Sequence, residues 1–153
     1  MALKRFRSAA DVIAFAIDRE IRAAERYGRM ADLAGTPGLR EMLLFLRGEE
    51  ESHRRLLEGL TSDQIGRLEP SLAPDLGLVD DLADEPLAAD MSLQELLIYA
   101  ARKEKQAVDL YEALARTAEA AGQKDFFLFL AGQERDHKLK LETAYETHVL
   151  PEN

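Results

Sequence analysis

The stretch LFLRGEEESHRRLL at residues 44–57 recurs as LFLAGQERDHKLKL at residues 128–141. Each copy keeps a glutamate and a histidine three residues apart, Glu50 with His53 and Glu134 with His137. Residues three apart lie on one face of an α-helix, so each pair can direct a carboxylate and an imidazole at a single point. The stretch therefore predicts two equivalent helices that carry the same chemistry.

The similarity extends well beyond this stretch. An offset of 84 residues aligns residues 8–58 with residues 92–142 without a gap, and sixteen of these 51 positions are identical. The apolar residues around them are spaced as in helices rather than in alternation. Similarity at a fixed offset is typical of a repeated structural unit, which here is a helical hairpin. The identical positions include the pairs Glu20/Glu104, Tyr27/Tyr111 and Gly48/Gly132.

Each hairpin is expected to contain two long helices. The first should begin after Ser8 and, in the second copy, after Ser92, because an acidic residue follows each serine three positions later in a capping-box-like pattern. Breaks are expected at Gly35–Gly38 and near Ala121–Gly122. The second helices should then cover about 39–60 and 124–147.

We predict one all-α domain over residues 1–153, with hairpin 1 at about 8–60, a crossover at about 62–90 and hairpin 2 at about 92–147. Short links within hairpins and a long link between them are typical of a ferritin-like four-helix bundle. Proline and glycine in the crossover predict irregular structure with room for one helical turn. Residues 68–101 contain eight acids and no Lys or Arg, which indicates a solvated connection or, alternatively, a surface for cations or a basic partner.

The composition excludes several kinds of function. With no cysteine, the chain has no disulfide, zinc–thiolate site, iron–sulfur cluster or catalytic thiol. A net charge of −9 argues against a nucleic-acid partner. No apolar run approaches the roughly 18 residues of a membrane span, and the first residues lack an apolar signal segment. We expect a cytoplasmic protein that contacts neither membrane nor nucleic acid.

The shared acids and histidines form a candidate metal site. Bundles that bind two metal ions use one Glu from each of two helices and Glu-x-x-His from each of the other two. Glu20 and Glu104 occupy equivalent places on the first helices. Four carboxylates balance two divalent ions, and mixed oxygen and nitrogen ligands suit Fe or Mn and admit Zn. The predicted ligands are Glu20, Glu50, His53, Glu104, Glu134 and His137, with no catalytic residue beyond them.

A Glu-x-x-His motif on an exposed helix face usually has no function. Here Leu46 lies four residues before Glu50 and Leu57 four residues after His53, so the motif shares the apolar stripe of its helix. Four glutamates in an apolar core would be prohibitive without metal or protons. These facts favour metal binding. By contrast, we expect surface charge on other faces at Glu25, Glu49 and Glu51.

Two tyrosines and two glycines accompany the candidate ligands. Tyr27 and Tyr111 each follow a first-helix glutamate by seven residues. Each is either a core residue with a satisfied hydroxyl or a donor to a ligand carboxylate from behind the metals; both can hold at once. Gly48 and Gly132 indicate close helix approach, room for a small oxidant, or simply an exposed surface.

These motifs resemble the rubrerythrin-like family of the ferritin-like di-iron carboxylate superfamily. The resemblance covers about residues 8–147 and implies a centre of two Fe ions that reacts with hydrogen peroxide or dioxygen, often in a homodimer. It is carried by Glu20-x6-Tyr27, Glu50-x-x-His53, Glu104-x6-Tyr111 and Glu134-x-x-His137.

Two features depart from that family. Rubrerythrins carry a four-cysteine rubredoxin domain, and because these residues contain no cysteine, we expect an external electron-donor protein. Ala107 stands where rubrerythrins usually have a further Glu. This leaves a symmetric set of six ligands, which is closer to ferroxidase centres of the bacterioferritin type.

The leading functional hypothesis is a di-metal oxidoreductase of the ferroxidase or peroxidase kind. The alternative is a metal buffer, carrier or sensor without turnover. A quinone-modifying di-iron monooxygenase would share the duplicated motif but would need an apolar membrane-facing patch, which the sequence does not clearly contain. A metal-free interaction bundle would contain no Fe, Mn or Zn after purification.

Overall fold

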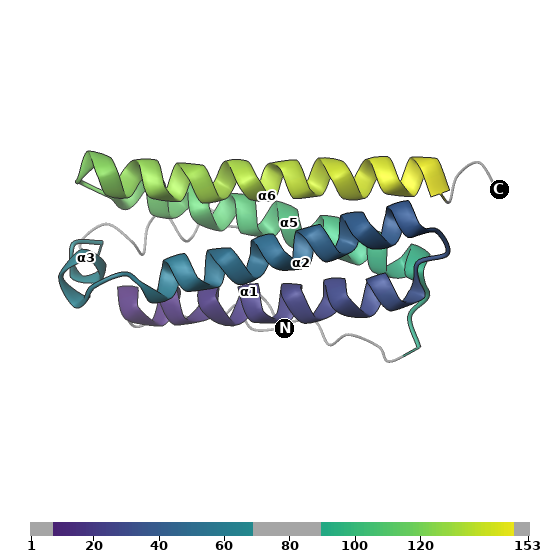
Figure 1. Cartoon of the computed structure of the whole chain (residues 1–153). Coiled ribbons are helices and arrows are strands. Elements are labelled where there is room, and N and C mark those ends of the chain that lie inside the picture. The colour runs from purple at the N-terminus through teal and green to yellow at the C-terminus, as the bar shows by residue number, and fades with distance from the viewer. Residues whose placement is uncertain (1–7, 69–89, 149–153) are drawn as a thin grey trace.

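The computed structural model of the chain describes residues 8–68 and 90–148. In these residues, four long helices form two hairpins, α1 with α2 and α5 with α6 (Figure 1). The all-α architecture of two helical hairpins is as predicted. The helices span Ala9–Leu33 (α1), Pro37–Glu58 (α2), Ser62–Gly66 (α3), Leu93–Thr117 (α5) and Ala121–His148 (α6).

Side-chain caps define the starts of the long helices. The Ser8 hydroxyl accepts a hydrogen bond from the backbone N–H of Asp11 (3.1 Å). At the equivalent place, Ser92 and Glu95 form a complete capping box, in which each side chain accepts a hydrogen bond from the other's backbone N–H. Both caps were predicted from the repeat. They satisfy N–H groups that have no partner within the helix.

The link inside the second hairpin lies earlier than predicted. Helix α5 ends where Ala118 turns to an extended conformation, and the first bond of the next helix runs from Lys124 N to Ala120 O (3.0 Å). The break predicted near Ala121–Gly122 therefore lies at residues 118–120, just before the predicted position, and Gly122 lies in the first turn of α6. Glycine marks a nearby helix end but does not fix on which side of the end it lies.

The apolar core is divided into two clusters with the polar site between them. One contains Ala16, Leu57 and Leu130, and the other contains Ala23 and Leu46. On α1, Glu20 falls between members of the two clusters, and the same holds for the candidate ligands on the other three long helices. The site is thus enclosed by packed side chains at both ends.

The predicted crossover lies mostly outside the described residues. Its beginning forms the short helix α3, whose capping box uses Thr61 and Gln64, in agreement with the expected helical turn. The acidic run from residue 69 to residue 89 falls outside the described ranges. Among the helices of residues 8–68 and 90–148, none is long and apolar enough to cross a membrane.

Candidate metal centre

The six predicted ligands meet at the middle of the bundle. They come from all four long helices, and none is more than 2% exposed. They form two overlapping groups of four residues. Within each group, one possible ligand atom from each residue lies within 4.8 Å of the other three. The first group is Glu20, Glu50, His53 and Glu134, and the second is Glu50, Glu104, Glu134 and His137.

The two histidines face the carboxylates from one side. His53 Nδ1 lies 3.4 Å from Glu50 Oε1 and 3.3 Å from Glu134 Oε1. His137 Nδ1 approaches the same two oxygens, at 3.0 Å and 3.1 Å. The imidazole rings stack with centroids 5.7 Å apart and planes 11° from parallel. The oxygens of Glu50 and Glu134 therefore stand between two imidazole nitrogens, where they can serve two ions.

The group of four that contains His53 has four buried atoms without a hydrogen-bond partner. They are Glu20 Oε2, Glu50 Oε1, Glu134 Oε1 and His53 Nδ1. A buried polar atom left without a hydrogen bond costs roughly 1–3 kcal/mol, so these four atoms are unfavourable at one point unless a cation, either a metal ion or a protonated imidazole, satisfies them. Carboxylate oxygens with imidazole nitrogen suit Fe, Mn or Zn. The residues present fit a bound metal ion.

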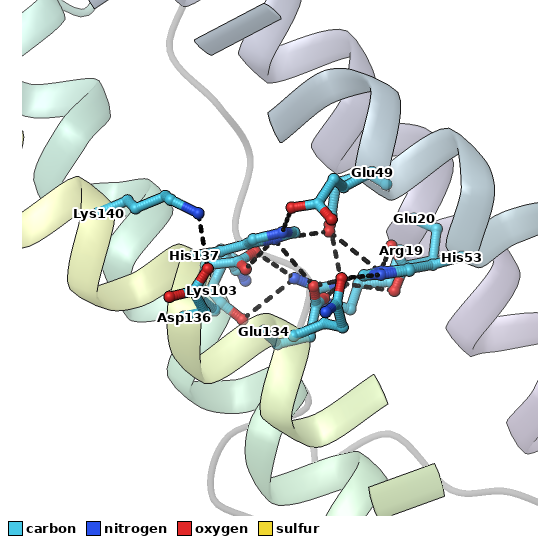
Figure 2. A network of polar contacts seen from close by, with 12 residues as sticks. Arg19, Glu20, Glu49, His53, Lys103, Glu134, Asp136, His137 and Lys140 are labelled. Atoms are coloured by element: carbon cyan, nitrogen blue, oxygen red, sulfur yellow. Dashed lines mark hydrogen bonds and ion pairs between the residues drawn. The ribbon is translucent and has the colours of Figure 1, made fainter. Parts of the chain in front are cut away.

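Arg19 lies on the opposite side of the carboxylates. Its Nη1 contacts Glu134 Oε2 (2.7 Å), Glu20 Oε1 (3.1 Å) and Glu50 Oε2 (3.5 Å), and its Nη2 contacts Glu104 Oε1 (2.8 Å). Figure 2 shows Arg19 beside Glu20 within this network. Arg19 was not predicted as a site residue, because it precedes Glu20 by one position and so points about 100° away on an ideal helix.

Burial and charge set the protonation of the cluster. Burial raises the pKa of Glu134, but Arg19 and the two histidines outweigh it and hold that pKa well below its usual range. Burial and the neighbouring carboxylates raise the pKa of Glu50. Burial lowers the pKa of His53, but the surrounding carboxylates outweigh it and raise the pKa to about 12. The pKa of His137 is raised by the same balance. Without metal, both imidazoles are therefore protonated at neutral pH.

The outer nitrogens of the histidines have different partners. His137 Nε2 lies 2.9 Å from Glu49 Oε1, whereas His53 Nε2 lies 3.5 Å from Gln133 Oε1. Glu49 and Gln133 are equivalent positions of the repeat. The prediction of Glu49 as surface charge was wrong, because its carboxylate reaches across from α2 to a ligand on α6 (Figure 2). Such partners fix the orientation of a metal-binding imidazole.

The two tyrosines behave differently although both are completely buried. The Tyr111 hydroxyl donates to Glu20 Oε1 (2.5 Å), which agrees with the predicted role behind the ligands. The Tyr27 hydroxyl has no hydrogen-bond partner. Both oxygens of Glu104, the glutamate equivalent to Glu20, are occupied by Arg19 and His137.

Two surface cavities adjoin the cluster. One of about 390 Å³ is lined by His53, Glu49, Gln133 and Gly48, and one of about 640 Å³ is lined in part by Glu20. A Cβ built at Gly48 or Gly132 would meet no atom within 4 Å. Of the three alternatives for these glycines, close helix approach is therefore excluded, and both glycines border open space, as the other two alternatives expect.

Together the fold and the site define a class of protein: a ferritin-like four-helix bundle with a buried carboxylate–histidine cluster. A solved structure from Thermotoga maritima, described as a ferritin-like diiron-carboxylate protein, matches 94% of this chain and 97% of its own at 18% identity, with a TM-score of 0.71. The rubrerythrin family model matches residues 95–153. The family model thus supports the resemblance drawn from the motifs over residues 95–153, and the structural match confirms the ferritin-like fold. No curated protein sequence matches the chain.

Proposed function

We propose that the chain binds two iron ions in this cluster and couples their oxidation to the reduction of hydrogen peroxide or dioxygen. The observation that carries the proposal is the convergence of unpaired buried oxygens and an imidazole nitrogen at one point. The solved protein with the same fold is described as a diiron-carboxylate protein, which supports iron here. Two bound ferrous ions would supply the two electrons that, with two protons, convert hydrogen peroxide into two water molecules.

The chain's own residues would hold and orient the ions. Glu50 and Glu134, whose oxygens approach both histidines, would be shared between two positions. His53 with Glu20 would complete one position, and His137 with Glu104 the other. Glu49 fixes the ring of His137. The apolar clusters at both ends limit access of water, and the cavities beside His53 and Glu20 provide approaches for a small oxidant.

The proposal requires an external reductant to return iron to the ferrous state. The chain contains no cysteine that could hold a rubredoxin-type centre. We therefore predict that an external electron-donor protein is a partner. The homodimer that the resemblance implies also stays a prediction.

Stopped-flow mixing of the Fe(II)-loaded protein with peroxide or dioxygen tests the proposed activity. We expect rapid growth of ferric absorbance in the wild type and in the control Glu142→Gln, since Glu142 is an exposed glutamate of α6 that pairs with Lys138 away from the cavities. Glu50→Gln should lose the fast phase. Tight, reversible iron binding without oxidation would contradict the enzyme and favour the alternative of a metal buffer or sensor.

A further inference from the structure

The four glutamates of the cluster divide their oxygens between two sides. One oxygen of each faces the histidines: Glu20 Oε2, Glu50 Oε1, Glu104 Oε2 and Glu134 Oε1. The other oxygen of each contacts the Arg19 guanidinium. Arg19 thus caps the face of the cluster opposite the histidines, with its side chain 12% exposed.

The guanidinium of Arg19 makes strong hydrogen bonds that a metal ion would have to compete with for the carboxylate oxygens. Its contacts of 2.7 Å to Glu134 and 2.8 Å to Glu104 are charge-assisted hydrogen bonds of the stronger kind. Lys103 occupies the equivalent position in the second hairpin, but its Nζ lies over the Tyr99 ring, 5.4 Å from the centroid. The first hairpin therefore contributes a cationic side chain to the cluster, and the equivalent side chain of the second hairpin lies over an aromatic ring instead.

Charge balance distinguishes the first ion from the second. Four ionised carboxylates balance two divalent ions without Arg19. With Arg19 in place, four ionised carboxylates and one divalent ion leave a net charge of about −1, and a second ion changes it to about +1, so only the first ion brings the buried cluster closer to neutral. The oxygens that face the histidines are also shared, since Glu50 Oε1 and Glu134 Oε1 approach both imidazoles. A carboxylate that held one ion with each of its oxygens would use the outer oxygen, which Arg19 contacts.

We propose that Arg19 is an internal cation that makes metal loading sequential. It holds the carboxylates together in the metal-free protein, remains in place when the first ion binds, and must release their outer oxygens before the second ion binds. This inference rests on the proposed function, because it concerns two ions in the same cluster. It assigns Arg19 a role in positioning the ligands and in setting the affinity of the second ion.

The test is an anaerobic titration with Co(II), followed by calorimetry and by visible absorbance, which reports the number of ligands. The wild type should bind in two unequal steps. In Arg19→Met the second dissociation constant should fall by roughly tenfold or more, as expected for losing competition from charge-assisted hydrogen bonds. Arg19→Lys keeps the positive charge but loses the forked donor of the guanidinium. Its second dissociation constant should lie between those of the wild type and Arg19→Met. Arg22→Met is the matched control, since Arg22 is exposed and pairs with Asp18 on the same helix.

Thermal unfolding of the metal-free proteins gives a second measurement. Arg19→Met should lower the unfolding midpoint, because four buried carboxylates lose their cation, whereas Arg22→Met should not. Two steps of unchanged affinity in Arg19→Met, or weaker binding of both ions, would overturn the inference. Should Arg19→Met not fold, Arg19→Gln and Arg19→Lys are judged by the same criteria. A wild type that binds no Co(II) would refute the proposed function itself, which is a distinct result.

Discussion

At the scale of single residues, Tyr111 and Tyr27 show how a repeated sequence yields a site that is not symmetric. Both occupy the same position of the hairpin and both are fully buried. Only Tyr111 donates to a ligand carboxylate. Arg19 contacts the equivalent oxygen of both glutamates, Glu20 Oε1 at 3.1 Å and Glu104 Oε1 at 2.8 Å, so the two hairpins differ in the tyrosine contact and not in the arginine contact.

This difference predicts unequal effects of two matched substitutions. Tyr111→Phe should weaken Co(II) binding by about tenfold to a hundredfold, the usual effect of losing a partner behind a metal ligand. Tyr27→Phe should change the affinity little and should not lower the free energy of unfolding, because it removes a buried hydroxyl that has no partner. Calorimetric titration and urea unfolding of both variants provide the check. Equal losses of affinity would contradict the asymmetry.

The raised histidine pKa values predict a pH dependence of metal binding. A metal ion needs a neutral imidazole, whereas the pKa of His53 is about 12 in the metal-free protein and that of His137 is raised as well. Binding therefore releases protons at neutral pH, and the affinity should rise as pH rises. The logarithm of the association constant should increase by roughly one per pH unit for each proton released.

Calorimetry in two buffers with different heats of ionisation counts these protons directly. With an unshifted pKa of about 6.5, the affinity would stop rising above about pH 7.5 for lack of protons to release. The account predicts that it continues to rise at pH 8. A plateau there would show that the carboxylates do not hold the imidazoles in the protonated form.

The sequence predicted the six candidate ligands that meet in the cluster but not the residues that surround them. Glu-x-x-His at helical spacing within an apolar stripe is a strong local signal, and its duplication locates Glu20 and Glu104 by register. Arg19 and Glu49 each precede a ligand by one position, which directs them away from it on an ideal helix. Their long side chains reach the cluster only because a neighbouring helix supplies the partner. No pattern within one helix contains that information.

At the scale of elements, the long helices depend on their caps and on one buried face. Helix starts at Ser8 and Ser92 could be predicted because a capping serine followed by an acid is a local pattern. The link before α6 could not be placed correctly, because Gly122 is compatible with either side of a helix end. Helix boundaries that depend on backbone conformation alone are harder to predict from sequence than boundaries at which a side chain caps the helix.

The complete capping box of α5 predicts the cost of removing it. Ser92→Ala eliminates the acceptor of the Glu95 N–H and should lower the free energy of unfolding of the metal-free protein by about 1 kcal/mol. Ser92→Asp keeps an acceptor at the same place and should retain most of the stability. Urea unfolding followed by far-UV circular dichroism distinguishes the two variants. Equal loss in both would mean that the cap contributes through packing rather than through its hydrogen bond.

At the scale of the whole molecule, duplication gives the bundle its central site. Each hairpin supplies one single glutamate and one Glu-x-x-His pair, and the two apolar clusters enclose them from both ends. The repeat was sufficient to predict this architecture, because equivalent hairpins place equivalent residues at equivalent heights. The course of residues 69–89 did not follow from it, since proline, glycine and acids there specify no periodic structure.

The central claim is that this cluster holds two metal ions. The most direct measurement is the number of ions bound per chain after anaerobic loading with Fe(II) and removal of unbound metal by gel filtration. The account predicts two ions per chain in the wild type and in Glu142→Gln, and a loss of both when Glu50 and Glu134 are replaced together by Gln. Less than one ion per chain in the wild type, or two ions retained in the double variant, would contradict it.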